Sequence, residues 1–515
     1  MWNPKTYHAM KRYTFYLYIV AAVLCISCKP EVKVPEGARA VEETAVIYPD
    51  YRDVTIPPNI APLNFLTENA GDAFVAAIEG QGESLVAAAG SDGKLQFDAV
   101  AWTALLSANK GQRLTVTLYA KRDGEWVSLP AWHLDVAQEP IDRYLSYRLI
   151  EPSYELYRQL GLYQRDLESF DEFVIYENNR SYEEEHNHCI NCHNYQGYDT
   201  RRMLFHVRAN HGGTIFVDNG KVRKMNMKVD SVLSNCVYPT WHPSQPWVVF
   251  SSNLTGQAFQ MQHKDKIEVV DYGSDLVFFD VEHNTLTNIL KTRTDMETFP
   301  CWSPDGRKLF YCSAHMPRFE NTPDSVHADI VLASYDSIRY NIYSMDFDPQ
   351  THRFSQPRLE VRCDSMGLSA TVPRVSPDGK YLLFTLGQFG QFHIWHSSSD
   401  QWVKNLETGD IYPLTESNSP EQDSYHTWSS NARWFVFSSR REDGNFTRPA
   451  IAYFGPDGKA RKAFILPQQD PEYHRLFFKS YNVPELTRSR VSVSPEQFRQ
   501  VIYDDEATGQ AVYKP

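Results

Sequence analysis

The chain has 515 residues, of which 42% are hydrophobic, 22% are charged and 13% are aromatic, and its formal net charge is -13. This length exceeds what one hydrophobic core supports, and the near-average composition excludes a largely disordered protein. The acidic balance argues against nucleic acid as a partner, because phosphate binding requires a basic face. The aromatic content favours strands, so we predict a mainly β protein with several domains.

The first 28 residues are typical of an export signal. Basic residues precede an apolar run at 13–27 that is too short to span a bilayer. Ser27, a small residue, then precedes Cys28, which resembles the lipobox of bacterial lipoproteins, although Cys25 stands where leucine is usual. The resemblance implies a signal peptide over residues 1–28, diacylation of Cys28, and a lipid-anchored protein of the cell envelope, in the periplasm or at the outer membrane. The alternative is an uncleaved N-terminal anchor.

The segment after Cys28 changes character at about residue 45. Residues 29–44 are polar, contain prolines and have no apolar period, which predicts a tether. Residues 45–138 contain short alternating segments separated by Gly and Asp turns, and the clearest hairpin turns at Asp123 and Gly124. We therefore expect a β-sandwich-like domain over 45–138, with a structural or docking role.

Residues 139–212 are predicted to be a helical linker that leads into a short motif. Tyr144, Tyr147, Leu149 and Leu160 lie at spacings compatible with one or two short helices, and Pro152 would end the first. Such helices would suit a flat apolar cofactor, which needs side chains on both of its faces. The alternative is that these residues form a domain interface.

The motif is Cys-x-x-Cys-His, formed by Cys189, Cys192 and His193. It resembles the attachment signature of c-type cytochromes, in which two thiols bind the haem covalently and the histidine binds the iron. The resemblance covers five residues. It implies one covalent haem c, with Cys189 and Cys192 as attachment residues and His193 as the proximal iron ligand.

Two other interpretations of the motif remain open. The thiols, together with His186, His188 and His193, could hold a tetrahedral zinc ion, since Cys and His are the usual ligands of structural zinc. The two cysteines could also be an accidental pair that stays reduced or forms a strained disulfide.

A sixth iron ligand, if the haem has one, must come from another part of the chain. We expect His211 and then His206, because a short excursion allows the chain to fold back over the ring; His188, Met203, Met225 and Met227 are further candidates. Peroxidase chemistry would instead require an open sixth position and a polar distal pocket, to which His206 and Arg208 could contribute.

The chain repeats from residue 214 onward. A strand, a turn of the Pro-Asp-Gly type and a second strand recur around Trp241, Trp302, Val375 and Trp428, at steps of 53 to 73 residues. Each copy is followed by two further strand-like segments, and four strands per repeat are typical of a propeller blade. The Trp-Ser-Pro-Asp-Gly motif resembles the repeats of TolB-like propellers. We predict a propeller over 213–515 with four secure blades, and residues 213–228 and 488–513 could bring the number to five or six.

The whole arrangement resembles exported bacterial lipoproteins in which a c-type haem segment precedes a TolB-like propeller. It implies electron transfer at the envelope, with a redox or envelope protein as partner docked by the propeller. The alternative is a non-enzymatic binding lipoprotein whose propeller binds a protein, peptide or glycan, with the haem or zinc structural. We find no phosphate-binding glycine loop, nucleophile elbow or His-Glu-x-x-His sequence, so a hydrolase is unsupported.

Overall fold

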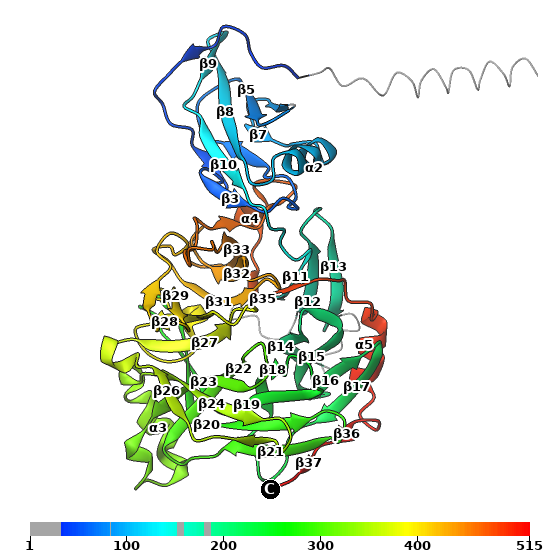
Figure 1. The fold of residues 1–515 in the computed structure, drawn as a ribbon, viewed down its shortest axis with the longest axis vertical. Helices are drawn as coiled ribbons and strands as arrows, with labels where there is room; N and C mark the ends of the chain where they lie inside the picture. The colour runs from blue at the N-terminus through cyan, green and yellow to red at the C-terminus, as the bar shows by residue number, and fades with distance from the viewer. Residues whose placement is uncertain (1–31, 83, 152–158, 180–186) are drawn as a thin grey trace, which may run out of the picture.

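The computed structural model describes residues 32–82, 84–151, 159–179 and 187–515. Nearly all of its regular structure is β. An N-terminal domain lies against one side of a ring of sheets (Figure 1). Over these described residues, no helix has the length and apolar character that crossing a membrane requires. The predicted signal peptide and Cys28 lie outside them.

The N-terminal domain combines two sheets and one helix. The larger sheet has the order β1-β9-β8-β10-β3, and β5 pairs with both β8 and β6. Its strands are β1 (Arg39–Ala40), β3 (Val54–Ile56), β5 (Ala73–Glu79), β6 (Leu85–Ala89), β8 (Arg113–Arg122), β9 (Glu125–Ser128) and β10 (Trp132–Val136). The smaller sheet contains β2 (Ile47–Tyr48), β4 (Phe65–Thr67) and β7 (Lys94–Leu95).

Two features of this domain differ from the sequence prediction. Helix α2 (Ala99–Ala108) lies within the segment expected to form only strands; the Asp98 carboxylate caps its first turn, and Trp102 and Leu106 are buried. The predicted tether is also shorter than expected, because β1 pairs with β9 and Glu43 forms an ion pair with Arg122 at 2.6 Å.

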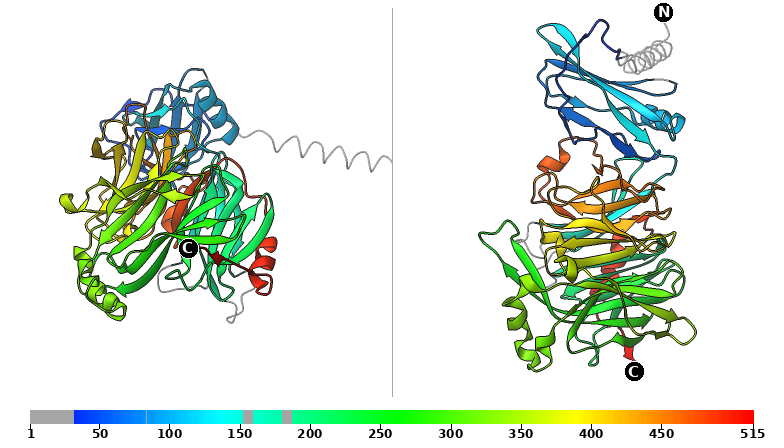
Figure 2. Two further views of the ribbon diagram at one scale, coloured as in Figure 1. Left: turned by 60° about the horizontal axis from the view of Figure 1, so that its bottom comes forward. Right: turned by 60° about the vertical axis from the view of Figure 1, so that its left-hand side comes forward.

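One hydrophobic core extends from the N-terminal domain into the last sheet of the ring. Trp434 is fully buried in it, and its indole N–H donates to the Glu139 carbonyl at 3.0 Å. An ion pair between Arg475 and Glu68 at 2.7 Å lies at the same junction. The last sheet and the residue that follows it contribute Trp434, Val436, Ile451, Phe464 and Leu466 to the shared core, and the ring strands at 144–150, 160–166 and 480–487 contribute Leu145, Tyr147, Leu149, Tyr163, Tyr481 and Leu486. Figure 2 (right) shows the N-terminal domain stacked directly on this sheet.

Six sheets among the described residues form the ring, and their strands pair antiparallel except for two short C-terminal strands, which pair in parallel. The first contains β35 (Ser480–Thr487), β11 (Tyr144–Ile150), β12 (Leu160–Asp166) and β13 (Glu172–Glu177). The second contains β14 (His188–Gln196), β15 (Asp199–Ala209), β16 (Gly213–Asp218), β17 (Lys221–Asn226) and β36 (Gly509–Gln510). The third contains β18 (Cys236–Trp241), β19 (Trp247–Phe259), β20 (Ile267–Asp280), β21 (Thr285–Leu290) and β37 (Val512–Tyr513).

The remaining three sheets follow in chain order. The fourth contains β22 (Asp295–Trp302), β23 (Lys308–His315), β24 (Asn341–Asp348), β25 (Arg353–Phe354) and β26 (Arg358–Val361). The fifth contains β27 (Ser369–Val375), β28 (Tyr381–Gly387), β29 (Asp400–Asn405) and β30 (Ile411–Pro413). The sixth contains β31 (Asp423–Trp428), β32 (Trp434–Ser439), β33 (Arg448–Tyr453) and β34 (Phe464–Ile465).

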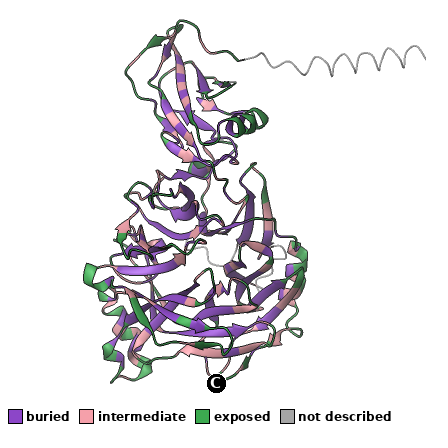
Figure 3. Ribbon diagram, viewed as in Figure 1, coloured by how far each residue is buried: buried purple, intermediate pink, exposed green. Residues whose placement is uncertain are grey.

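The first strands of the sheets face one another around a common axis. Strands β14, β18, β22, β27, β31 and β35 each contact the next, and β35 contacts β14, so the ring closes. Closure depends on the chain's late strand β35, which pairs with the early strand β11 from Ile150–Ser480 to Tyr144–Thr487. Most strand residues of the ring are buried (Figure 3). This is a β-propeller, which confirms the predicted fold class at that level.

The prediction of helices at 139–212 is wrong for the described residues 139–151, 159–179 and 187–212. Residues 144–150 form β11, in which Leu145, Ser146, Tyr147 and Leu149 are buried, and residues 160–166 form β12, which is buried throughout. A fully buried strand has no polar face, so its sequence cannot be distinguished from a buried helix by periodicity. The propeller therefore starts at Tyr144, and the motif segment belongs to it.

Short helices occupy the connections and the C-terminal segment. They are α3 (His327–Leu332), α4 (Tyr473–Leu476) and α5 (Pro495–Tyr503), with single 3-10 turns at Pro317–Phe319, Asp324–Val326, Tyr335–Ser337, Asp364–Met366 and His393–Trp395. The Ser494 side chain and Gln497 form a capping box at the start of α5. Residues 488–513, expected to supply strands, thus contain a helix and only the two-residue strands β36 and β37.

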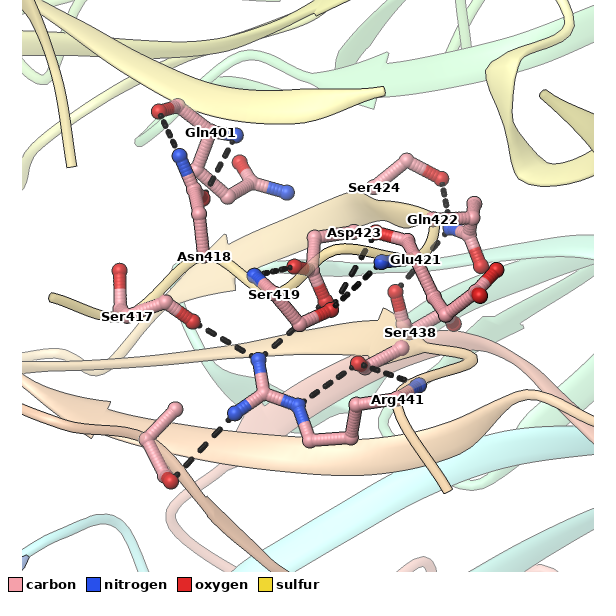
Figure 4. Close-up of polar contacts among 12 residues, drawn as sticks. Gln401, Ser417, Asn418, Ser419, Glu421, Gln422, Asp423, Ser424, Ser438 and Arg441 are labelled. Carbon is pink, nitrogen blue, oxygen red and sulfur yellow. Dashed lines mark hydrogen bonds and ion pairs between the residues drawn. The ribbon is translucent and has the colours of Figure 1, made fainter. Parts of the chain in front are cut away.

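A buried polar network fixes the start of β31 (Figure 4). Asp423 is fully buried; it accepts from the Ser419 N–H at 2.6 Å and pairs with Arg441 at 3.2 Å. The Arg441 guanidinium also donates to the Ser417 carbonyl at 2.7 Å. A buried carboxylate held by a cation and a backbone donor is satisfied, so this network fixes the geometry of the sixth sheet.

Candidate ligand-binding site in the central cavity

A cavity of about 870 Å³ lies where the innermost strands of the ring meet. All six innermost strands contribute to its lining, as do β11, β15, β19 and β20. A site on the axis of a closed ring is built on rigid strands and receives side chains from many parts of the sequence.

Each innermost strand carries a bulge at the same place. At this bulge one residue that is not glycine has a left-handed backbone conformation, and its side chain lines the cavity. The six residues and their φ angles are Cys192 (53°), Tyr238 (47°), Phe299 (51°), Val372 (50°), Tyr425 (51°) and Val483 (49°). The pairing register shifts at each of these positions.

This ring of bulges is energetically unfavourable in isolation. A left-handed conformation costs an L-residue roughly 1–2 kcal/mol, and it is rarest for β-branched residues such as Val372 and Val483. Strain of this kind persists only where the surroundings enforce it, and bulges redirect side chains near functional sites. Its repetition in all six innermost strands identifies the cavity wall as the candidate functional surface.

The bulges also show what the Cys-x-x-Cys-His motif is in structural terms. The residue after each left-handed position is Pro in four strands and His in two, namely His193 and His426. Cys192 and His193 therefore occupy the same repeat positions as Tyr425 and His426. The blade repeat alone accounts for the second half of the motif.

Aromatic rings form one wall of the cavity. Tyr238 and Phe299 lie with ring centroids 4.3 Å apart, Phe299 and Tyr425 are 6.3 Å apart, and Phe392 contacts Tyr425 at 5.9 Å. Trp395 packs against the same cluster. Such a wall can hold the flat or apolar face of a ligand.

His193 on β14 and Glu485 on β35 lie close together in the cavity wall. The His193 Nε2 lies 3.9 Å from Glu485 Oε2, and neither ring nitrogen has a hydrogen-bond partner among the described residues. Burial, with a contribution from Arg148, lowers the pKa of His193 to about 3, while burial raises the pKa of Glu485 to about 8. Near neutral pH the imidazole is uncharged and the carboxyl is mostly protonated, so this contact is not an ion pair.

Of the predicted site residues, three come together at the cavity. Cys189, Cys192 and His193 all line it, and both thiols are free. The predicted distal ligands do not line the cavity. His206 forms a hydrogen bond with the Thr214 hydroxyl at 3.2 Å, and His211 forms one with the Asp505 carboxylate at 2.8 Å.

The other candidate ligands lie in the interior of the sheets. His188 pairs with the Tyr176 hydroxyl at 3.0 Å, and Met203, Met225 and Met227 are buried in hydrophobic cores. His186, part of the zinc alternative, lies outside the described residues. Within the described part of the chain, no three His, Cys, Asp or Glu side chains gather as a metal site.

Sequence reasoning missed most of the cavity. Arg148, Arg374, Glu485 and the aromatic wall were not predicted as site residues, although all of them line it, and Arg208 was considered only for a peroxidase pocket. The available signal was the recurring apolar residue before Pro or His, which also occurs at Val483 and Pro484.

No protein-family model matches the chain, and no curated protein matches it. Solved structures match at low identity. An oligogalacturonate lyase in complex with manganese is 10% identical with a TM-score of 0.34, over 62% of this chain and 73% of that one. The tricorn protease is 9% identical with a TM-score of 0.33, over 80% and 43%. A DUF4784 family protein from Bacteroides caccae is 10% identical with a TM-score of 0.22, over 82% and 84%. TM-scores this low carry no inference about activity or ligand.

Proposed function

We propose that the protein is an envelope lipoprotein whose six sheets act as the blades of a closed propeller that binds a small ligand, or the end of a glycan or peptide, in the central cavity. The observation that carries the proposal is the ring of six left-handed bulges, which directs one side chain from every innermost strand into the cavity. The cavity volume of about 870 Å³ lies within the ~300–1,000 Å³ range of ligand pockets. Its mixed aromatic and polar lining is also that of a binding site.

The proposal predicts saturable binding that a single obstructing side chain abolishes. Thr255 lies on the face of β19 that lines the cavity and is exposed, so Thr255→Trp should fold and place its indole in the cavity. Isothermal titration of the mature protein against oligosaccharides and short peptides should find a ligand. Thr255→Trp should weaken its binding at least tenfold with little change in Tm.

The matched control is Thr103→Trp, because Thr103 is exposed on α2 in the N-terminal domain and does not line the cavity. It should leave binding unchanged. If a ligand binds equally well to Thr255→Trp and to the unmodified protein, the site is not the cavity and the proposal is wrong.

Envelope anchoring forms a separate prediction. Acylation needs the Cys28 thiol, so Cys28→Ala should move the protein from the membrane fraction to the soluble fraction and remove the diacylglycerol mass from the N-terminal peptide. Fractionation and mass spectrometry measure both. An unchanged membrane fraction with no lipid mass in either protein would instead indicate an uncleaved anchor.

A second candidate function rests on one observation, namely that Cys189, Cys192 and His193 all line the same cavity. In a c-type haem protein, Cys189 and Cys192 would hold the porphyrin through thioethers and His193 would bind the iron. A bound haem would supply one-electron transfer. His193 fits this role in that its ring nitrogens have no hydrogen-bond partner among the described residues. The cavity lining contains neither His206 nor His211 as a sixth ligand.

The haem candidate is decided by a pyridine haemochrome spectrum and a denatured mass of the protein expressed with a haem-attachment system. One covalent haem that is lost in Cys189→Ser and Cys192→Ser would establish it. An unmodified polypeptide mass would reject it, and zinc found in the same sample would favour the metal alternative.

A further inference from the structure

The charged side chains of the cavity do not share the acidic character of the whole chain. Among the described lining residues, the charged groups are Arg148, Arg208, Arg374, Glu151 and Glu485. The chain as a whole has a net charge of -13. An excess of basic groups at this one place therefore needs an explanation.

None of the three arginines forms an ion pair within 4.0 Å in the part of the chain that the structure describes, although Arg374 acts electrostatically on Glu485. Arg374 donates only to the carbonyl of the preceding Pro373, at 3.0 Å, and makes an additional contact with the Cys301 thiol. The Nε of Arg148 is buried without a hydrogen-bond partner. All three arginines are half-buried, and their guanidinium groups form strong charge-assisted hydrogen bonds with oxyanions, so these donors are available to a ligand.

The three arginines outnumber the two carboxyl groups of the lining. Glu151 pairs with Lys479 at 3.0 Å. Glu485 accepts from the Asn194 amide at 3.0 Å and from the Tyr195 N–H at 3.1 Å. The described lining therefore carries more basic than acidic groups, and both of its carboxyl groups already have other partners.

The arginines come from separate sheets and surround the aromatic wall. Arg148 lies on β11, Arg208 on β15 and Arg374 on β27. Arg148 and Arg374 both act electrostatically on the Tyr425 hydroxyl, and Arg208 acts on the Tyr238 hydroxyl. Their charges thus converge on the ring of bulges from more than one side.

We infer that the ligand of the cavity is an organic anion, whose carboxylate or phosphate groups bind Arg148, Arg208 and Arg374 while its apolar or flat face lies against Tyr238, Phe299 and Tyr425. This inference rests on the proposed binding function and adds the chemical class of the ligand. Guanidinium groups bind both kinds of oxyanion in the same bidentate way, so carboxylate and phosphate share one recognition chemistry.

The test is a titration with three probes: a hyaluronan tetrasaccharide, which carries carboxylates, inorganic pyrophosphate, and neutral maltotetraose. We expect at least one anionic probe to bind saturably and maltotetraose not to bind. The anion that binds more tightly identifies carboxylate or phosphate as the group recognised. Arg148→Gln, Arg208→Gln and Arg374→Gln should each weaken binding about tenfold or more, as expected for the loss of a charge-assisted hydrogen bond.

Two controls separate this inference from the proposed function. Arg113→Gln removes an exposed arginine that pairs with Asp135 on the N-terminal domain, and it should not change binding. Thr255→Trp should abolish binding of the anion. If maltotetraose binds and Thr255→Trp blocks it, the cavity function holds and the anionic class is wrong. If neither anion binds, or if the arginine variants bind as well as Arg113→Gln, the inference is overturned.

Discussion

A chain that ends at Lys479 is expected not to form a closed, cooperatively folded ring. This truncation removes β35, which contributes buried Tyr481 and Leu486 and forms the backbone ladder with β11. It also leaves the inner edge of β11 unpaired inside the ring. Losing two large buried side chains costs roughly 2–5 kcal/mol each, which alone approaches the total stability of about 5–15 kcal/mol typical of a domain. Near-ultraviolet circular dichroism and thermal unfolding measure the loss.

The control is a chain that ends at Glu506. It keeps β35 and α5 but lacks the two-residue strands β36 and β37, so it should retain cooperative unfolding with a moderately lower Tm. In the full-length chain, Leu486→Ala should lower stability by about 2–5 kcal/mol. A chain ending at Lys479 that unfolds at the Tm of the full chain would show that β35 does not close the ring.

The replacement Glu297→Gln is expected to stabilise the protein at alkaline pH. Glu297 is 2% exposed; its Oε1 accepts from Thr292 at 3.1 Å and its Oε2 has no partner among the described residues. Burial, and to a smaller extent the charge of Asp275, raises its pKa to about 9. The folded protein therefore retains a proton that the unfolded chain releases above about pH 4.5.

The sign of the pH dependence follows from this difference. Because the folded pKa is raised, the contribution of Glu297 is fully favourable below about pH 4.5 and is lost as pH rises towards 9. Glutamine does not ionise, so at pH 8 the variant should be more stable by about 2–4 kcal/mol, given that one pKa unit corresponds to ~1.4 kcal/mol. At pH 4.5 the two proteins should be nearly equal. Urea unfolding at both pH values measures the difference.

Two comparisons make this prediction specific. Glu407→Gln changes an exposed turn residue and should alter stability little at either pH. Asp275→Asn should reduce the stability gained from Glu297→Gln in the double variant. The charge of Asp275 raises the pKa of Glu297, so removing that charge makes ionisation of Glu297 less unfavourable. A Glu297→Gln variant that is equally stable relative to the parent at pH 4.5 and pH 8 would contradict the buried-proton explanation.

The propeller was predictable because its signal is repeated. The turn after Trp302 and the strand pair that follows it recur with the same chemistry near Val375 and Trp428, and each copy strengthens the others. Strands β11 and β12 were not predictable in the same way. Residues on both faces of these strands are buried, so their sequences have no alternation of polar and apolar residues. Helix α2 did carry a signal: Asp98 as N-cap, followed by Trp102, Leu105 and Leu106 at helical spacing.

The candidate site was only partly predictable. A five-residue motif specifies residue types but not the backbone that carries them, so Cys189, Cys192 and His193 suggested a haem segment of its own. In the fold, Cys192 and His193 are the first copy of a repeat whose last copy is Val483 and Pro484. Arg148 and Arg374 could not be found from the sequence, because they become neighbours of Arg208 only when distant sheets close into a ring.

The core shared between the N-terminal domain and the sixth sheet has a consequence for how the cavity is presented. Trp434 and its neighbours pack the N-terminal domain and the propeller against each other, and the pairing of β1 with β9 orders the chain from Arg39 onward. If Cys28 holds the protein to a lipid surface, the residues between Cys28 and Arg39 allow β1 to lie at most roughly 40 Å from the bilayer. The N-terminal domain and the cavity then move together as one body within that distance of the membrane.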